Sequence, residues 1–431
     1  MQSNRQEVRD ARVAARQLRH MQSSSLKRLW ILMAIVFVDM IGGLMILPIL
    51  PFYAQKIGVR PSLVTVIGAA FFLSQLISAP LWGRFSDRYG RRPMLLLGLS
   101  TSAVAFAFFG LAASFWQFLL FRLVQGAGGG TTGVVQAYVS DSVPPHERAK
   151  ALGWISAATS AGVMIGPLLG SAATYLGHAS PGFLAAGLCT LNVIGAWLWL
   201  PESRQRAEGT AAEEPLRPLT QALWDVVRYP SSPVASLIWV YAFGMMAFMA
   251  MNGVLALYLG AEYQVNEKNI GILYAYVGCI SVVMRAILLG PTVRRFGEVG
   301  VMRMGSLSLV LGLACLPLVG SLGAARPVKL ALLAVVVLFV PVGTALLFPA
   351  TTALVSWRGR QEEMGQIMGV QQFMGSVARV IGPLWAGVVF EKDIRYPFWV
   401  AAALMLGVSG LTWRQKESTS ASLAPPLPEE A

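Results

Sequence analysis

The sequence predicts an all-α membrane protein in which twelve transmembrane helices form two six-helix bundles. Of its 431 residues, 55% are hydrophobic and only 13% are charged, whereas a soluble domain carries about 25% charged residues. Apolar segments close to the ~20 residues that a membrane helix needs recur along almost the whole chain. Glycine occurs 43 times and proline 24 times, which suits helices packed closely within a membrane. This composition excludes a water-soluble enzyme.

Each apolar segment is interpreted as one membrane span. The first six spans are predicted at residues 29–52, 61–82, 93–112, 115–139, 150–173 and 181–200. The second six are predicted at residues 234–258, 269–290, 299–320, 328–352, 363–388 and 396–413.

Polar segments at the ends and in the middle complete the organisation. The expected parts are a basic cytoplasmic tail (1–28), an N-terminal bundle (29–200), a cytoplasmic linker (201–233), a C-terminal bundle (234–414) and a disordered tail (415–431). The first tail is too polar for a secretory signal. Its arginines, spaced by four and three residues, either follow one helical stripe on anionic lipid or belong to a frayed end. They are Arg5, Arg9, Arg12, Arg16 and Arg19.

The basic residues predict the orientation. With a cytoplasmic amino terminus, 24 Lys and Arg residues fall on the inside, seven fall outside and three lie within helices. The positive-inside rule therefore places both termini in the cytoplasm of a multi-pass protein of the plasma (inner) membrane. Because topology accounts for the net charge of +13, that charge does not indicate nucleic-acid binding.

The two halves of the chain repeat each other. A shift of 216 residues brings Gly153, Gly166 and Pro167 onto glycine or proline in the second half, and a shift of 207 lays Gly90 on Gly297. Parallel repeats of this kind allow a transporter to rock around a central cavity.

A glycine- and arginine-rich loop follows the second predicted span. Its sequence, from Gly83 to Pro93, is Gly-Arg-Phe-Ser-Asp-Arg-Tyr-Gly-Arg-Arg-Pro. Glycine permits close approach or a positive φ, and proline opens a helix at its first turn. The residues assigned to this conformational loop motif are Gly83, Asp87, Arg88, Gly90, Arg91, Arg92 and Asp141.

Three motifs together resemble the major facilitator superfamily. They are the loop above, the Arg-Leu-Val-Gln-Gly segment from Arg122 to Gly126, and a fifth-span pattern found in antiporter members. That pattern consists of Gly153, Gly162, Gly166, Pro167 and Gly170. The stretch Val38–Pro51 is most similar to the twelve-span drug/proton antiporters, in particular the tetracycline efflux proteins. The resemblance implies a major facilitator fold, alternating access and export of small amphiphilic compounds in exchange for protons.

Asp39 and Arg122 are the candidate proton-coupling residues. Asp39 is the only acid deep within a predicted span, where a charge is costly and usually marks function. Helix geometry places Arg122 within about 5 Å of the same depth. Asp39 either exchanges a proton for substrate as its distance from Arg122 changes, or forms a fixed structural ion pair with Arg122.

The resemblance implies that the first, fourth, seventh and tenth helices line the substrate cavity. Methionine and aromatic side chains in the seventh suit amphiphilic ligands, although such residues also face lipid or a core. The assigned cavity residues are Gln136, Tyr241, Phe243, Met246, Asn252, Thr344, Phe348, Gln371, Gln372 and Arg379. The antiporter glycines are expected to pack closely on a neighbouring helix, or to be ordinary small packing residues.

Two alternative functions are also considered. Arg285 and Arg379 lie at positions where the tetracycline efflux proteins carry uncharged residues. This favours a second hypothesis, transport of a metabolite, siderophore or lipid-like substrate, including an anionic one. A third hypothesis, from another class, is a membrane receptor or scaffold that transports nothing.

No enzymatic activity, cofactor, metal site or disulfide is expected. The three histidines and three cysteines are scattered. The glycine cluster from Gly126 to Gly130 lies within a predicted span and lacks the Lys-Ser/Thr pair of a phosphate-binding loop. The expected partners are a small-molecule substrate, protons and the lipid bilayer, and the protein is expected to be a monomer.

Overall fold

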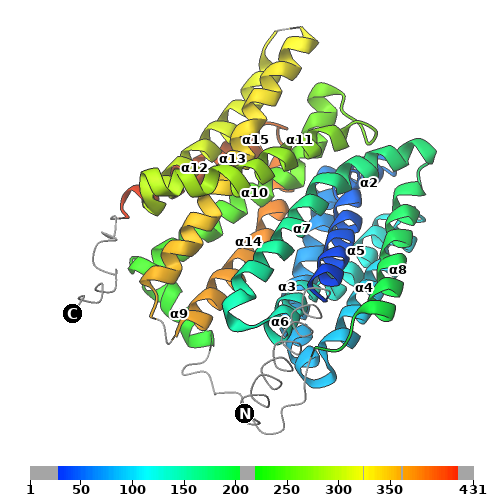
Figure 1. Ribbon diagram of the computed structural model, residues 1–431. Helices are drawn as coiled ribbons and strands as arrows, with labels where there is room; N and C mark the ends of the chain where they lie inside the picture. Colours follow the sequence, from blue (N-terminus) through cyan, green and yellow to red (C-terminus); the bar gives the residue numbers. More distant parts are fainter. Residues whose placement is uncertain (1–27, 204–218, 324, 361–362, 416–431) are drawn as a thin grey trace, which may run out of the picture. The chain divides into compact units, whose positions relative to one another are not determined.

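The computed structural model describes residues 28–203, 219–323, 325–360 and 363–415. Most of both predicted tails and residues 204–218 of the predicted linker lie outside these ranges. Every regular element within them is helical (Figure 1). The first helix covers residues 28–46. In the first half it is followed by α2 (Leu50–Lys56), α3 (Pro61–Tyr89), α4 (Arg91–Phe109), α5 (Phe115–Gly128), α6 (Thr131–Ser142), α7 (Pro145–Ala173), the short η1 (Thr174–Leu176) and α8 (Ser180–Trp199).

The second half continues with α9 (Leu219–Arg228), α10 (Pro233–Tyr263), α11 (Ile270–Val283), the π-helix η2 (Met284–Leu288), α12 (Leu289–Ser321), α13 (Arg326–Arg358), α14 (Met364–Phe390) and α15 (Tyr396–Trp413). Proline occupies one of the first two positions of several long helices, including α3, α8, α13 and α15. Its fixed φ suits that position, and the missing N–H has no intrahelical partner there. Local sequence thus determines where these helices begin.

Two of the expected spans are interrupted in the structure. The first helix ends at residue 46, within the expected span 29–52, and α2 begins at Leu50. The expected span 115–139 is two helices, α5 and α6, interrupted at Gly129 and Gly130. The expected spans 269–290 and 299–320 both lie in the stretch Ile270–Ser321, where non-helical backbone at Gly297 separates them. Within the described residues, ten helical stretches are long and apolar enough to cross a membrane. A count of twelve spans remains a prediction.

The long stretch Ile270–Ser321 bends at Gly297, where φ is 66°. Gly90, which the repeat pairs with Gly297, also has a positive φ, of 105°. Side chains with a Cβ rarely adopt this conformation, whereas glycine adopts it freely. The same backbone turn therefore occurs at equivalent positions of both halves, which is what the internal repeat predicts.

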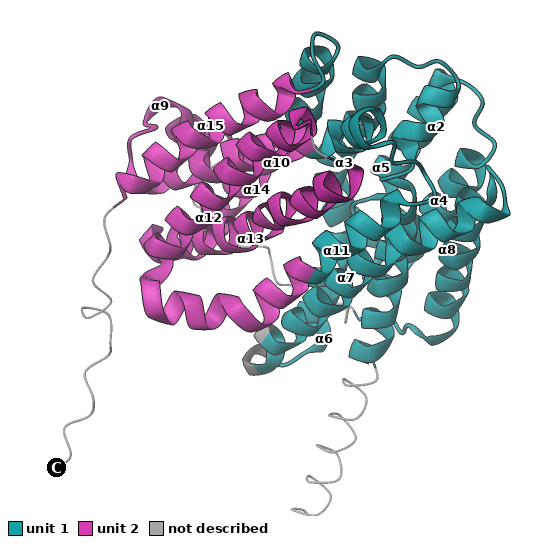
Figure 2. Ribbon diagram, turned by 90° about the horizontal axis from the view of Figure 1, so that it is seen from above, with its two compact units in different colours: residues 1–214, 252–279, 379–394 teal, residues 215–251, 280–378, 395–431 magenta. Residues whose placement is uncertain are grey.

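The chain forms two compact units that do not coincide with the two halves of the sequence (Figure 2). Unit 1 contains residues 1–214, 252–279 and 379–394, and unit 2 contains residues 215–251, 280–378 and 395–431. In unit 1, α4 packs against α5 and α8, and α3 packs against α5. In unit 2, α12 packs against α13 and α15. Each unit has its own apolar core.

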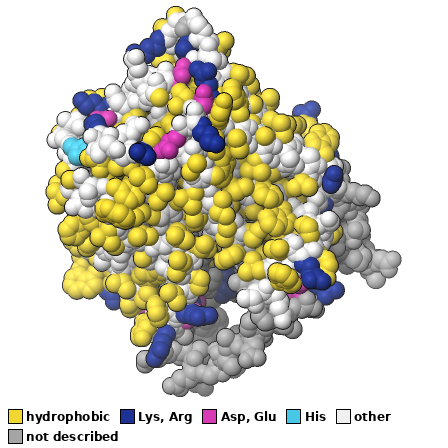
Figure 3. Space-filling view, turned by 180° about the vertical axis from the view of Figure 1, so that it is seen from behind, with side chains coloured by type: hydrophobic (Ala, Val, Ile, Leu, Met, Phe, Trp, Pro, Cys, Tyr) yellow, Lys and Arg dark blue, Asp and Glu magenta, His cyan; other side chains and the backbone are white. Residues whose placement is uncertain are grey.

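Many large apolar side chains lie on the surface of the helices. Trp116 in α5 is 73% exposed and Leu191 in α8 is 66% exposed. Figure 3 shows one face on which hydrophobic side chains predominate, while Lys and Arg gather toward its margins. Exposed apolar area on this scale is unfavourable in water and favourable in hydrocarbon. The chain is a multi-pass membrane protein.

Candidate functional site

Asp39 lies in the first helix, seven residues before the helix ends. Its side chain is half-buried, and within the described part of the chain the carboxylate forms no hydrogen bond or ion pair. The surrounding helix is held firmly, because the Asn192 amide of α8 donates to the Ile35 carbonyl at 2.8 Å. A Cβ on Gly42 would lie 2.9 Å from the Cys189 sulfur of α8. The helix that carries Asp39 is therefore fixed in position, but the carboxylate has no hydrogen-bond or ion-pair partner among the described residues.

Three glycines of the antiporter pattern lie against this first helix. A Cβ built on Gly162 would lie 2.7 Å from the Phe37 carbonyl oxygen, and one on Gly166 would lie 2.9 Å from the Ile41 carbonyl oxygen. At Gly170 the distance to the Met45 carbonyl oxygen would be 2.1 Å. Real Cβ atoms do not approach this closely. Glycine thus allows α7 to touch the backbone of the helix that carries Asp39.

Arg122 in α5 is buried, with 3% of its surface exposed. Its Nη1 donates to the Gln125 Oε1 at 2.8 Å, and the guanidinium lies 6.0 Å from the centre of the Phe71 ring. Its Nε and Nη2 have no hydrogen-bond partner among the described residues, and no ion pair joins Arg122 to Asp39 there. A buried cation with unpaired donors favours a nearby anion.

The interruption between α5 and α6 lies just beyond Arg122. Helix breaks at membrane depth leave carbonyl groups that need donors. Side chains of α3 supply them: Gln75 donates to the Gly129 carbonyl at 2.9 Å and the Trp82 indole donates to the Ala127 carbonyl at 2.5 Å. Gly126 and Gly130 leave no room for a Cβ beside α3. The glycine cluster therefore serves a close helix contact.

The predicted loop motif is an ion-pair cluster between α3 and α4. Arg91 contacts Asp87 at 2.7 Å through Nη1 and Asp141 of α6 at 3.0 Å through Nε. Its Nη1 also donates to the Ser86 hydroxyl at 2.6 Å. The Arg92 Nη2 donates to the Trp197 carbonyl at 2.5 Å. The motif thus ties α3, α4, α6 and α8 together at one end of unit 1, and its arginine and both acids were identified in the sequence.

Glu202 belongs to the same cluster but was assigned to the linker. Its carboxylate accepts the backbone N–H groups of Arg91 at 2.9 Å and Arg92 at 3.1 Å. These are free donors at the first turn of α4, where a negative charge is favourable. Glu202 lies 111 residues from Arg91, and no local pattern marks such a cap. The only available signal was an acid directly after the sixth span.

Unit 2 contains an aromatic and methionine cluster. The Tyr241 and Phe348 rings meet edge to face at 5.3 Å, and Phe248 lies 6.3 Å from Phe348. Met245 is buried beside them, and Met246 and Met249 pack against this cluster. Flexible thioethers and rings give an adaptable apolar surface. Tyr241, Met246 and Phe348, three of the expected cavity residues, are brought together here.

Four other expected cavity residues in unit 2 lie outside the Tyr241 cluster. The Thr344 hydroxyl is buried and donates to the Pro341 carbonyl at 3.1 Å. Gln371 is fully buried and donates to the Thr352 hydroxyl at 2.8 Å. Gln372 is exposed, and Phe243 stacks on Trp239 at 5.1 Å. These four side chains do not belong to the Tyr241 cluster.

The remaining expected cavity residues belong to unit 1. Gln136 is exposed on α6. Asn252 and Arg379 lie on α10 and α14, at the points where these helices enter unit 1. Arg379 is half-buried and forms no hydrogen bond or ion pair with the described residues.

The family model of the Major Facilitator Superfamily matches residues 32–383. The chain belongs to this superfamily. Multidrug resistance protein 2 of Bacillus subtilis (strain 168) is 30% identical to it over 404 residues, 91% of this chain and 96% of that protein. Tetracycline resistance protein, class B, of Escherichia coli is 25% identical over 88% of this chain and 92% of its own length.

Solved structures of the superfamily share the fold. The crystal structure of the human organic anion transporter MFSD10 covers 90% of this chain and 99% of its own, with a TM-score of 0.64 and 23% identity. The membership expected from the three motifs and the all-α fold class are thus confirmed. The chain is a major facilitator transporter with multidrug and tetracycline resistance proteins among its relatives.

Proposed function

We propose that this transporter is a proton-coupled antiporter that exports small amphiphilic compounds by alternating access. The observation that carries the proposal is Asp39, a half-buried carboxylate within a membrane helix that has no partner among the described residues. An intramembrane acid is costly unless it serves an ion or proton pathway. Two relatives are named for resistance to drugs, which supports export rather than uptake.

The exchange step uses Asp39 and Arg122. Asp39 takes a proton from the outer side as substrate leaves, and gives it up on the inner side when substrate or Arg122 engages the carboxylate. The Nε and Nη2 of Arg122, which have no hydrogen-bond partner among the described residues, are donors for such an anion. The glycine contacts of α7 with the first helix hold Asp39 in register while the bundles rock. The Arg91 cluster holds the cytoplasmic ends of the helices.

The substrate surface includes the Tyr241, Phe348 and methionine cluster of unit 2. It offers dispersion contacts and ring faces with few fixed hydrogen bonds, which suits compounds of varied shape. The proposed location is the plasma membrane, with both termini in the cytoplasm. Each charge that crosses the membrane supplies about 2.3 kcal/mol per 100 mV, so a proton gradient can drive accumulation outside the cell.

Substrate-induced proton release from the purified, detergent-solubilised protein tests this proposal. Tetracyclines, quinolones and cationic dyes would be added to weakly buffered protein while the pH is recorded. We expect release from the wild-type protein and from Asp225→Asn, an exposed acid of α9, but none from Asp39→Asn. Undiminished release from Asp39→Asn would exclude the assigned acid. Binding of substrate without proton release in any variant would favour the receptor hypothesis.

A second candidate, export of anionic compounds, is favoured by Arg379. This half-buried cation forms no ion pair with the described residues, and an anionic substrate would compensate its charge. Counterflow with neutral, cationic and anionic compounds separates the candidates. Loss of only the anionic flux in Arg379→Gln would support this second candidate, whereas equal loss of all three fluxes would not.

A further inference from the structure

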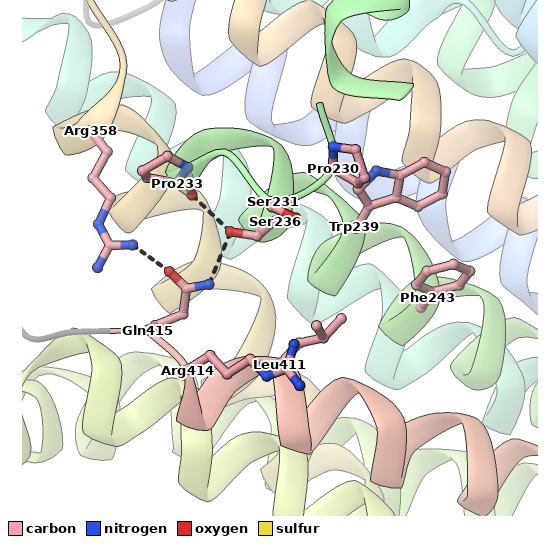
Figure 4. A pocket seen from close by; sticks show the side chains of 10 residues that line it. All are labelled: Pro230, Ser231, Pro233, Ser236, Trp239, Phe243, Arg358, Leu411, Arg414 and Gln415. Carbon is pink, nitrogen blue, oxygen red and sulfur yellow. Dashed lines mark hydrogen bonds between the residues drawn. The ribbon is translucent and has the colours of Figure 1, made fainter. Parts of the chain in front are cut away.

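A cavity of about 770 Å³ lies within unit 2, and none of its lining residues belongs to the Tyr241 cluster. It is lined by Pro230, Ser231, Pro233, Ser236, Trp239, Phe243, Arg358, Leu411, Arg414 and Gln415 (Figure 4). Its size falls within the ~300–1,000 Å³ typical of ligand sites. Two guanidinium groups line it, and none of the ten residues is acidic. The charge of the lining therefore favours an anion.

The polar groups gather at one end of the cavity. Arg358 donates to the Gln415 Oε1 at 2.5 Å, and the Gln415 amide donates to the Ser236 hydroxyl at 2.9 Å. Figure 4 shows Arg358 and Arg414 on either side of Gln415. Arg303 also holds this rim, because its Nη2 donates to the Gln415 carbonyl at 2.8 Å. An ordered set of cationic and neutral donors is thus assembled from α10, α13 and α15.

The other end of the cavity is apolar. Trp239 and Phe243 stack along α10 at 5.1 Å, and Leu411 faces the cavity from α15. Trp239 and Phe243 lie six and ten residues from the first residue of α10, or about 9 and 15 Å along the helix at 1.5 Å per residue. A small inorganic anion would leave this apolar part empty.

The helix ends place the cavity at the edge of the membrane. Pro233 begins α10, Arg358 ends α13, and Arg414 follows the last residue of α15. The amphipathic helix α9 lies beside it, since the Trp239 indole donates to the Val226 carbonyl at 3.2 Å. Trp224 and Tyr229 are 60% and 58% exposed there, as expected for aromatic residues at a lipid headgroup level. The charge count predicts that this is the cytoplasmic side.

We propose that this cavity binds one anionic phospholipid of the cytoplasmic leaflet. The phosphate lies between Arg358 and Arg414, and the first part of an acyl chain lies along Trp239 and Phe243. Arginine suits phosphate because its planar guanidinium donates two parallel hydrogen bonds. Basic pockets between membrane helices on this side are suited to anionic headgroups. The site is separate from Asp39 and is independent of the proposed proton exchange.

Native mass spectrometry of the delipidated full chain tests the site. Phosphatidylglycerol, phosphatidylcholine and inorganic phosphate are titrated separately, and bound adducts and melting temperature are recorded. We expect one phosphatidylglycerol to bind at least tenfold more tightly than phosphatidylcholine, and inorganic phosphate to give no stabilisation. If inorganic phosphate displaces the lipid at equal concentration, the ligand is a free anion and the lipid assignment is wrong.

Matched double variants test the residues. Arg358→Gln/Arg414→Gln should weaken the phosphatidylglycerol adduct at least tenfold, whereas Arg294→Gln/Arg295→Gln removes the same charge from exposed positions of α12 and should leave it unchanged. Equal binding by all three proteins, or equal loss in both variants, would overturn the site. Because Arg358 also bonds Gln415, the single exposed change Arg414→Gln is measured as well. It should weaken binding at least threefold without lowering the melting temperature of the lipid-free protein.

Discussion

Gly170 allows α7 to contact the first helix because its side chain is a single hydrogen atom instead of a methyl group. Replacing glycine with alanine inside a helix usually stabilises by about 0.5–1 kcal/mol. At Gly170, however, the new Cβ would lie 2.1 Å from the Met45 backbone oxygen, so α7 must move away from the first helix. We expect Gly170→Ala to destabilise by about 1–3 kcal/mol, seen as a lower melting temperature in detergent.

Gly153 provides the matched control for this prediction. It belongs to the same motif and the same helix, but a Cβ there would meet nothing within 4 Å. Gly153→Ala should therefore leave the melting temperature unchanged or raise it slightly. An equal decrease in both variants would mean that the close contact with Met45 does not determine the requirement for glycine.

For individual residues, the sequence indicated which charged side chains to consider, but it did not indicate which groups they contact. Asp39 and Arg122 were identified because charges are rare within apolar spans, and Arg91, Asp87 and Asp141 do meet as an ion-pair cluster. Glu202 was missed because its contact with α4 depends on how α8 packs, which no local spacing encodes. Thr344 and Gln371 were assigned to the cavity as polar side chains at compatible places, but the Thr344 hydroxyl and the Gln371 amide both donate to groups within unit 2.

At the level of elements, the N-terminus of α4 depends on a distant acid. Glu202 accepts the first two free N–H groups of this helix, and its charge opposes the positive end of the helix dipole. Glu202→Ala should cost about 1 kcal/mol of stability and loosen the turn at Gly90. Thermal unfolding measures the cost, and Asp225→Ala, which removes an exposed acid from α9, should leave stability unchanged.

Helices were predictable from the sequence where a proline marks the first turn and an apolar segment is long enough to span a membrane. The interruption of the fourth expected span was not, although its glycines were visible in the sequence. A run of glycines inside an apolar segment is compatible with a continuous, closely packed helix and with a broken one. The outcome depends on donors from α3, such as Gln75 and Trp82, that bind the exposed carbonyls.

At the level of the molecule, several polar contacts between described residues join the sequence halves within unit 1, and two of them involve carboxylates. Lys56 contacts Glu267 at 2.5 Å, and the Ser62 hydroxyl and amide donate to Glu391 at 2.6 and 3.1 Å. The proposed topology turns this end outward, and under the proposed alternating access both contacts break when the outer side opens. The repeat within the sequence does not predict these two contacts. Each contact joins residues more than 200 positions apart, and no local pattern marks such a pair.

The Ser62–Glu391 contact should resist mild acid. Hydrogen bonds from the Ser62 hydroxyl and amide lower the pKa of Glu391 below its ordinary value of 4.5. A depressed carboxyl pKa gives stabilisation that is complete above the ordinary value and is lost only as the pH falls through the depressed one. Spin labels at Gln55→Cys and Lys392→Cys, in a cysteine-free background, should give the same distance distribution at pH 7.5 and 5.5.

Lowering the pH below the ordinary carboxyl pKa of 4.5 should broaden the distance distribution between the two spin labels. Ser62→Ala removes the hydroxyl donor and should shift the change to higher pH. Broadening already at pH 5.5 in the unaltered contact would contradict the predicted sign. It would also mean that these contacts respond to the proton gradient, in addition to the response proposed for Asp39.

Three helices pass from one compact unit into the other without an intervening loop: α10 between residues 251 and 252, α11 between 279 and 280, and α14 between 378 and 379. Cleaving the polypeptide in its loops therefore releases neither unit intact. Separate expression of either unit would require cutting through hydrogen-bonded helix, which leaves unpaired backbone groups in hydrocarbon. Calorimetry should accordingly record one cooperative melting event for the whole transporter, and any genetic division that preserves folding should fall between α8 and α9.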